Sequence, residues 1–311
     1  MTLFYYDPIF QEHVTGDHPE NGGRILSVIR HLSFVGLDAS CRRPSWKPAS
    51  AERLCYVHTP EYVESVKQFA LSGGGYIEED TAVSKKSYEI ACMAAGAACD
   101  AVERVVRGED KTAFCLVRPP GHHAMPDHAM GFCLLNNIAV GARVATRELG
   151  IERVLIVDID VHHGNGTQAI FWEDPLVAYF SMHCFPLYPE TGAADEIGAG
   201  PGVGTILNLP IAQGTPRDEL LGTFRHQLKE FAARIKPQLV LVSAGFDAHK
   251  DNPVGSLGLE TDDYKGITRS LLEIADEYAD GKLVSVLEGG YNPHALTDCV
   301  TVHLETLLGE I

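Results

Sequence analysis

The sequence is poor in positive charge, with 25 Lys and Arg residues against 42 Asp and Glu residues and a formal net charge of −17. Nucleic acid is therefore excluded as an expected partner, because binding a polyanion requires clustered Lys and Arg side chains. The charge suits a cationic ligand. An alternative interpretation is that the acidity serves only solubility.

The sequence also lacks long apolar runs and paired cysteines. No stretch approaches the length of a membrane span, and the N-terminal MTLFYYDPIF has neither the basic segment nor the long apolar run of a secretory signal. The eight cysteines include no C-x-x-C pair, which favours free thiols in a reducing compartment. We therefore expect a cytoplasmic protein with no membrane segment.

No internal repeat, low-complexity tract or linker divides the 311 residues. Hydrophobic residues make up 45% of the chain, which is enough for a large core at this length. We predict one domain spanning residues 1–311. The sequence does not specify the oligomeric state.

Short apolar runs alternate with helix-like segments. Runs of this kind suit strands buried on both faces, and they lie at 113–117, 154–160, 176–183, 204–210, 238–247 and 282–291. The stretches 87–108 and 133–150 are helix-like and end at glycines, while helix-start signals stand at Thr59-Pro60, Thr215-Pro216 and Thr261. The alternation predicts an α/β fold with a mostly parallel central sheet and helices on both faces. Ligands bind such sheets at the carboxyl ends of the strands.

Chemistry-bearing residues follow the predicted strands. Asp158, Asp160 and His162 come directly after the run VLIV, where alternating side chains would share one face. Two buried carboxylates and an imidazole would be costly to bring together without a cation, so this segment favours a metal site over a solvated acidic loop. Asp247 ends another apolar run, and Asp160, His162 and Asp247 would give the three ligands of an open zinc site. Alone, Asp247 could equally cap a helix.

Two further strand ends carry His122-His123 and Tyr291. Paired histidines can serve as general acid and base, as metal ligands or as simple loop residues. Tyr291 follows two glycines and could donate a hydrogen bond to a developing oxyanion, or only pack against a turn.

Five motifs occur in order between residues 118 and 291: R-P-P-G-H-H-A, G-F-C-x-x-N-N, D-x-D-x-H-H-G-N-G-T, S-A-G-F-D and E-G-G-Y. Together with His18-Pro19-Glu20 and Arg24, they resemble the zinc-dependent histone deacetylase family, closest to its class II branch and its bacterial relatives, which include acetylpolyamine amidohydrolases. The resemblance implies a single-domain, three-layer fold like that of arginases and deacetylases. It also implies a zinc-dependent deacylase that acts on linear amides.

Site roles follow from the same resemblance. Asp160, His162 and Asp247 match the zinc ligands, although iron(II) suits the same set. His123 matches the general base that activates the attacking water. His122 matches the second histidine beside that base, and Asp158 matches the carboxylate partner of the second histidine. Tyr291 matches the residue that polarises the acyl carbonyl. Asn165 stands where some members carry an aspartate beside the catalytic histidine.

The resemblance extends to substrate and potassium sites. Gly131, Phe132 and Tyr188 match a narrow tunnel for the acyl-amine chain, and Arg24 matches an arginine beneath the active site near a proposed acetate exit. A structural potassium ion is implied at Asp158, the backbone of Asp160 and His162, Ser181 and Met182.

One position of the sequence bears on the choice of substrate. Polyamine-selective members carry an acidic gatekeeper after the third zinc ligand, where this sequence has Val254. An apolar residue there favours acylated lysine in peptides or proteins over acetylated polyamines. Other possibilities are a dinuclear manganese ureohydrolase, an idle acyl-amine-binding module, and an acetoin-utilisation protein. The retained His123 and Tyr291 argue against the idle module. The segments 14–24 and 72–86 are expected to form loops at the entrance.

Overall fold

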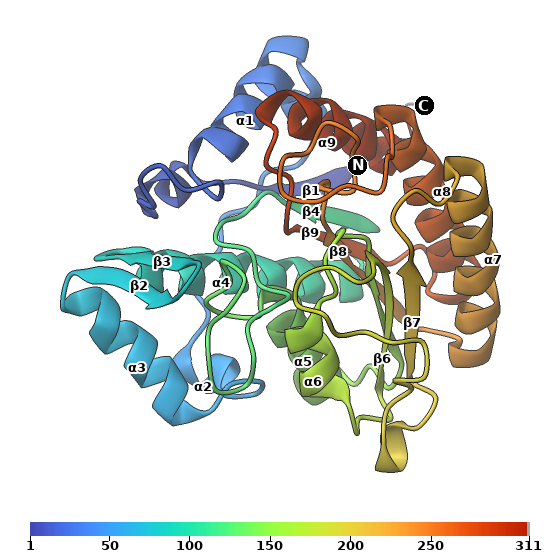
Figure 1. Cartoon of the computed structure of the whole chain (residues 1–311), viewed down its shortest axis with the longest axis horizontal. Helices are drawn as coiled ribbons and strands as arrows, with labels where there is room; N and C mark the ends of the chain where they lie inside the picture. The colour runs from blue at the N-terminus through green and yellow to red at the C-terminus, as the bar shows by residue number, and fades with distance from the viewer. Residues whose placement is uncertain (310–311) are drawn as a thin grey trace.

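The computed structural model describes residues 1–309, which contain a seven-stranded sheet in the order β1-β4-β9-β8-β5-β6-β7 (Figure 1). Every neighbouring pair is parallel. The strands are β1 (Thr2–Tyr5), β4 (Thr112–Cys115), β5 (Val154–Asp158), β6 (Val177–Cys184), β7 (Ile206–Ile211), β8 (Leu239–Ala244) and β9 (Leu283–Leu287). The sheet is therefore entirely parallel, where the sequence predicted a mostly parallel one.

Helices cover both faces of this sheet (Figure 1). One group comprises α4 (Ser87–Val106), α5 (Asn137–Glu148) and α6 (Asn165–Phe171), and the other comprises α1 (Gly23–Val35), α7 (Arg217–Ile235), α8 (Thr261–Tyr278) and α9 (Pro293–Leu308). The predicted three-layer α/β fold is confirmed. None of the helices within residues 1–309 is long and apolar enough to cross a membrane.

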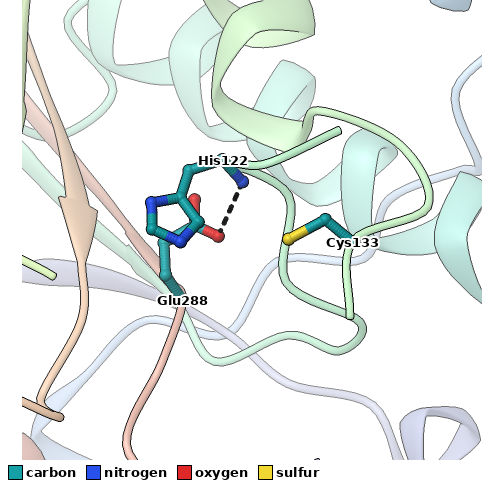
Figure 2. Close-up of side chains that lie close together, drawn as sticks. All are labelled: His122, Cys133 and Glu288. Carbon is teal, nitrogen blue, oxygen red and sulfur yellow. Dashed lines mark hydrogen bonds between the residues drawn. The ribbon is translucent and has the colours of Figure 1, made fainter. Parts of the chain in front are cut away.

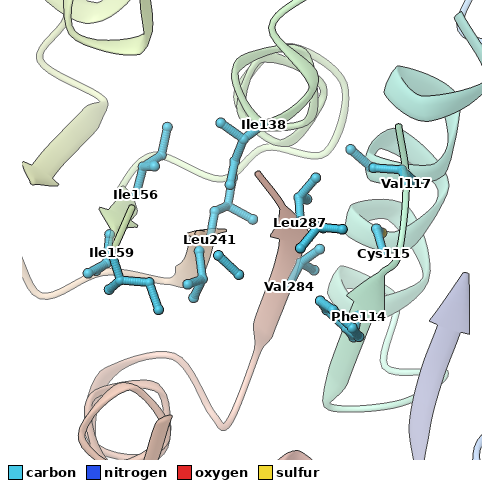
Figure 3. Packing of buried hydrophobic residues seen from close by; sticks show 14 of the residues in the cluster. Phe114, Cys115, Val117, Ile138, Ile156, Ile159, Leu241, Val284 and Leu287 are labelled. Carbon is cyan, nitrogen blue, oxygen red and sulfur yellow. The ribbon is translucent and has the colours of Figure 1, made fainter. Parts of the chain in front are cut away.

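The core lies between the sheet and its helices. All residues of β4, β5, β8 and β9 are buried, because each strand is covered on both faces. Figure 3 shows side chains from these strands, among them Phe114, Ile156, Leu241 and Val284, packed with Ile138 of α5. Each such side chain contributes about 1.5–3 kcal/mol when fully buried. The strand ends that carry the candidate site thus project from a rigid platform.

A small antiparallel hairpin lies outside this sheet. It consists of β2 (Gly74–Glu78) and β3 (Thr81–Ser84), and it follows α2 (Ala51–Leu54) and α3 (Pro60–Leu71). The segment 72–86 is therefore a hairpin rather than the loop expected from its sequence. Gly74 makes this possible: its φ is +78°, and a Cβ there would lie 2.1 Å from the Val83 carbonyl oxygen. Residues 1–309 also contain three short 3₁₀ helices, η1 (Pro8–Glu12), η2 (Leu37–Ser40) and η3 (Gly200–Gly202).

Some predicted element boundaries are wrong for local reasons. The helix expected from residue 133 begins at Asn137, because the Asn136 side chain caps it by accepting a hydrogen bond from Ala139 N at 3.1 Å. Thr59 caps α3 as predicted, accepting from Tyr62 N. Thr215 does not cap α7; its hydroxyl donates to the Ala212 carbonyl. None of the eight cysteines, all of which lie within residues 1–309, forms a disulfide bond.

Candidate metal and catalytic site

The carboxyl ends of four neighbouring strands meet at one place. The sheet order β4-β9-β8-β5 brings together the segments that follow these strands, although they lie far apart in the sequence. His122 and His123 follow β4, Tyr291 follows β9, Asp247 follows β8, and Asp160 follows β5. The topology thus unites residues that the sequence could only place at separate strand ends.

Asp160, His162 and Asp247 form a buried group whose potential ligand atoms all lie within 4.8 Å of one another. His162 Nδ1 is 3.0 Å from Asp160 Oδ1 and 3.2 Å from Asp247 Oδ2. Asp158 lies outside this group, because its carboxylate turns toward His122. Of the three residues that alternate after β5, Asp160 and His162 therefore belong to this group, and Asp158 pairs with His122.

The group has the properties of a metal site. Asp247 Oδ2 is buried and has no hydrogen-bond partner within residues 1–309, although His162 Nδ1 lies 3.2 Å away. Burial, together with the charge of Asp160, raises the pKa of Asp247 to about 6. Burial alone would lower the pKa of His162, yet the carboxylates of Asp160 and Asp247 raise it to about 10. The two carboxylates therefore favour a positive charge beside His162 Nδ1. A bound divalent metal ion would provide that charge.

A second buried group, His122, Cys133 and Glu288, also has ligand-type atoms close together (Figure 2). Both carboxylate oxygens of Glu288 already have hydrogen-bond partners. Glu288 Oε2 accepts from the backbone N–H groups of Gly121 and His122 at 2.6 and 3.1 Å, and Oε1 accepts from Ser243 Oγ at 3.1 Å. Because no oxygen of Glu288 is unsatisfied, this cluster positions the histidine loop and needs no metal.

Glycines allow the carboxylates to pack this closely. A Cβ on Gly289 would lie 2.1 Å from Asp247 Oδ2, and one on Gly245 would lie 2.1 Å from Asp160 Oδ2. The Gly289 N–H also donates to Asp160 Oδ2 at 2.9 Å. The glycines in S-A-G-F-D and E-G-G-Y are thus needed for close backbone approach.

The two histidines have opposite electrostatic environments. His122 Nδ1 donates to Asp158 Oδ2 at 3.0 Å; burial alone would lower the pKa of His122, but Asp158 and Asp160 raise it to about 10. His123 Nδ1 lies 2.8 Å from Asn165 Oδ1, and burial, with the nearby cationic histidines, lowers its pKa well below the usual range. His122 is therefore charged and His123 neutral at pH 7.

These groups surround a narrow cavity of about 150 Å³. Its wall is formed by Asp80, His123, Gly131, Phe132, His162, Tyr188, Val254 and Tyr291. Pockets for drug-sized ligands are typically about 300–1,000 Å³, so this one suits a slender chain better than a ring system.

Comparison with known proteins identifies the family. Residues 18–307 match the Histone deacetylase domain. The chain is 36% identical to a histone deacetylase-like amidohydrolase of Pseudomonas aeruginosa, over 99% of this chain and 86% of that protein. The chain belongs to the histone deacetylase family. It is also 36% identical to the polyamine deacetylase HDAC10 of Homo sapiens, over 99% of this chain and 48% of that protein.

The fold of this histone deacetylase family member agrees with a solved structure. The crystal structure of the HDA15 HD domain superposes with a TM-score of 0.92 at 35% identity, covering 99% of this chain and 90% of that one. The resemblance drawn from the five motifs is therefore confirmed. The family assignment and the buried Asp–His–Asp group together identify an amidohydrolase-type enzyme with a metal site.

The tunnel residues implied by the family lie together in the structure. Gly131, Phe132, Tyr188 and Val254 all line the cavity. Gly131 has a φ of +55°, and a Cβ there would lie 2.3 Å from His123 Cδ2. Phe132 has a φ of +68°, a conformation rare for a bulky residue, and its N–H donates to Thr81 Oγ1 at 3.1 Å. The β2–β3 hairpin thus braces one wall of the tunnel.

Arg24 lies behind the cavity rather than in its wall. Its guanidinium stacks 4.6 Å from the centroid of the Tyr291 ring, and it donates to the backbone carbonyls of Gly290 and Glu288 at 2.6 and 2.7 Å. Arg24 also pairs with the buried carboxylate of Glu20 at 3.0 Å. It therefore supports the segment that carries Tyr291, and its assignment to substrate binding stays a prediction.

The predicted potassium ligands lie on adjacent strands. Asp158 and Ser181 are register partners on β5 and β6, and Ser181 Oγ is 2.9 Å from His183 Nδ1. Met182 follows on β6 and is fully buried. The potassium assignment stays a prediction.

Two residues that support the site, Asn252 and Glu288, could not be assigned a role from the sequence. The Asn252 side chain accepts from Tyr291 N at 2.7 Å, and Glu288 holds the backbone of the His122 loop. Glu288 is the first residue of E-G-G-Y, but the backbone N–H groups that it binds lie more than 160 positions earlier in the chain. No local pattern in the sequence reveals such contacts.

Proposed function

We propose that this protein is a zinc-dependent amidohydrolase that removes acetyl or other short acyl groups from lysine side chains of peptides or proteins. The observation that carries the proposal is the unsatisfied Asp247 Oδ2 within a buried Asp–His–Asp group, beside the neutral His123 and Tyr291, at the end of one narrow cavity.

Asp160, His162 and Asp247 would hold the metal, with iron(II) as an alternative to zinc. When bound, zinc supplies a Lewis acid that polarises the acyl carbonyl and lowers the pKa of a water molecule. A structural potassium ion at Asp158, Ser181 and Met182 would offset the negative charge nearby. The donor set fits these ions, because carboxylate, imidazole and hydroxyl groups are their usual ligands.

His123 would act as the general base. It is neutral, and its Nδ1 is occupied by Asn165, so Nε2 is the nitrogen that can take a proton from the attacking water. The same imidazole would then protonate the leaving amine. His122, held charged by Asp158, would stabilise the negative charge that develops beside it.

Tyr291 would stabilise the oxyanion. Burial, first, and neighbouring carboxylates raise the pKa of its phenol well above the usual range, so the hydroxyl remains a neutral hydrogen-bond donor. Two contacts fix the position of Tyr291. Its backbone N–H donates to Asn252, and its ring packs against the guanidinium of Arg24. A donor held in place before the reaction stabilises a transition state most effectively.

The cavity wall supports an acyl-lysine substrate. Val254, Phe132 and Tyr188 give it apolar sides that match a methylene chain, with the reacting groups at its end. Val254 offers no charge to the inner ammonium of a polyamine. The remainder of a peptide would stay outside.

An acetylated polyamine is the second candidate. Asp80 lies in the cavity wall, and the human relative is a polyamine deacetylase by name. A polyamine cation could pair with Asp80 rather than with position 254.

The test of the mechanism is turnover by the zinc-loaded protein and its Tyr291→Phe and His123→Ala variants on an acetyl-lysine peptide and an acetylpolyamine. Each variant should lose at least about a hundredfold in kcat while keeping the wild-type circular dichroism spectrum. Near-normal turnover in both variants would contradict the mechanism. Binding without turnover by the parent protein would favour the idle module.

We further propose that residues 1–311 form one catalytic domain. A single sheet that runs from Thr2 in β1 to Leu287 in β9 supports this.

A further inference from the structure

The Asn165 side chain lies between His123 and two methionines. Its Oδ1 is 2.8 Å from His123 Nδ1, and its Nδ2 donates to Met130 Sδ at 3.1 Å and Met125 Sδ at 3.4 Å. Asn165 is the first residue of α6, and both methionines belong to the segment after β4. All three side chains are partly buried.

An amide, unlike a carboxylate, has two different ends. If Oδ1 faces His123, the ring carries its proton on Nδ1 and leaves Nε2 bare. If the amide is flipped, Nδ2 donates to Nδ1 and the proton moves to Nε2. That second tautomer cannot accept a proton from water at Nε2, so the orientation of Asn165 decides whether neutral His123 is a base.

The thioethers discriminate between these orientations. A methionine sulfur is a weak hydrogen-bond acceptor and has no hydrogen to donate. The observed orientation gives each sulfur an N–H, whereas the flipped one would turn Oδ1 toward two acceptors. Backbone hydrogen bonds from Met125 N to His128 O and from Cys133 N to Met130 O keep the segment in place.

We propose that Met125 and Met130 are positioning residues whose sulfurs hold the Asn165 amide with its carbonyl toward His123 and so select the tautomer with an unprotonated Nε2. The proposal rests on the proposed function of His123 as base. It predicts that the sulfurs matter as acceptors, beyond the space that they fill.

The experiment replaces both methionines with leucine, which keeps most of the volume and removes the acceptor. For the zinc-loaded Met125→Leu/Met130→Leu variant we expect kcat to fall about three- to tenfold with KM within twofold. Met93→Leu, a partly buried methionine on α4, is the matched control and should leave kcat unchanged. Nitrogen-15 NMR of the His123 ring should show a bare Nε2 in the parent and a population protonated at Nε2 in the double variant.

The Asn165→Asp background separates orientation from packing. A carboxylate presents an oxygen to His123 in either orientation, so adding the two leucines to Asn165→Asp should lower kcat less than twofold further. An equal loss in both backgrounds would show a packing role and overturn the proposal, as would a bare Nε2 in the double variant. The NMR readout needs no turnover, so an inactive parent protein would contradict the proposed function without deciding the tautomer.

Discussion

At the scale of single residues, the main support for a metal site is one buried carboxylate oxygen that has no hydrogen-bond partner. Asp247 Oδ2 is buried beside a second carboxylate and lacks a hydrogen-bond donor within the described chain, whereas every oxygen of Glu288 nearby has one. A buried carboxylate in this condition is costly unless a cation joins it. The same comparison distinguishes the metal group from the neighbouring histidine–cysteine–glutamate cluster.

The Asp247→Asn variant tests this distinction. An amide gives a weaker ligand for a divalent metal, and we expect zinc affinity to fall by at least about a hundredfold, since even changes beyond the ligands themselves cost about 10–100-fold. A chelator-competition titration measures it. Asp251→Asn, an exposed carboxylate four residues later, is the control. Unchanged affinity in Asp247→Asn would exclude Asp247 as a ligand.

Gly131→Ala tests the close approach of the tunnel wall to the base. The added methyl would lie 2.3 Å from His123 Cδ2, so the imidazole must move, and a displacement of about 1 Å can cost about a hundredfold in rate. We expect kcat/KM to fall by about that factor. Gly108→Ala introduces a methyl at a similarly positive φ of +78° with nothing within 4 Å, and should lower stability without changing kcat/KM. Equal effects of the two substitutions on activity would contradict this account.

At the scale of helices and strands, His303 links three elements of the fold. It lies on α9, with Nδ1 2.7 Å from Thr268 Oγ1 on α8 and Nε2 2.9 Å from Ser285 Oγ on β9. The ring is fully buried, and burial lowers its pKa to about 3. His303 is therefore neutral in the folded protein and takes up a proton more readily once the chain unfolds.

This difference predicts a pH dependence of stability. Because the pKa of His303 is lower in the folded than in the unfolded state, its contribution is complete above about pH 6.5 and is lost as the pH falls toward 3. Between pH 6 and 4, protonation of His303 in the unfolded chain should lower the free energy of unfolding of the parent by about 1.4 kcal/mol per pH unit. A His303→Asn variant lacks this contribution, so its free energy of unfolding should fall less steeply by that amount. Urea unfolding at several pH values measures both slopes. Parallel slopes would mean that His303 is not buried as a neutral ring.

Helices and strands could be predicted where a local sequence pattern identifies them. The apolar runs at 154–160 and 238–247 identify β5 and β8, because buried parallel strands are apolar throughout. The β2–β3 hairpin was missed, since GGGYIEED has no alternating pattern and its pairing depends on a left-handed Gly74. In the site, the motifs identified the reacting side chains. The contacts that position these side chains, such as those of Asn165 with Met125 and Met130, could not be predicted, because they depend on packing between distant segments.

At the scale of the whole molecule, the net charge of −17 should influence substrate capture. Asp80 lies in the cavity wall, and Glu78 and Glu79 are exposed next to it. Salt screens such charges over about 10 Å at 0.1 M ionic strength. For an acetyl-lysine peptide flanked by arginines, KM should rise several-fold between 0.05 and 0.5 M NaCl with little change in kcat. A peptide with neutral flanks is the control, and an equal rise for both would show that long-range attraction is absent.

The central claim is that this histone deacetylase family member hydrolyses acyl-lysine through the Asp160–His162–Asp247 site. The most direct measurement compares kcat/KM of the zinc-loaded protein on an acetyl-lysine peptide and an acetylpolyamine, with Tyr291→Phe as the inactive control and Val254→Glu as the specificity variant. The account predicts a preference for the peptide that Val254→Glu shifts toward the polyamine. A preference for the polyamine in the parent protein would contradict the substrate assignment, and turnover that survives Tyr291→Phe would contradict the mechanism.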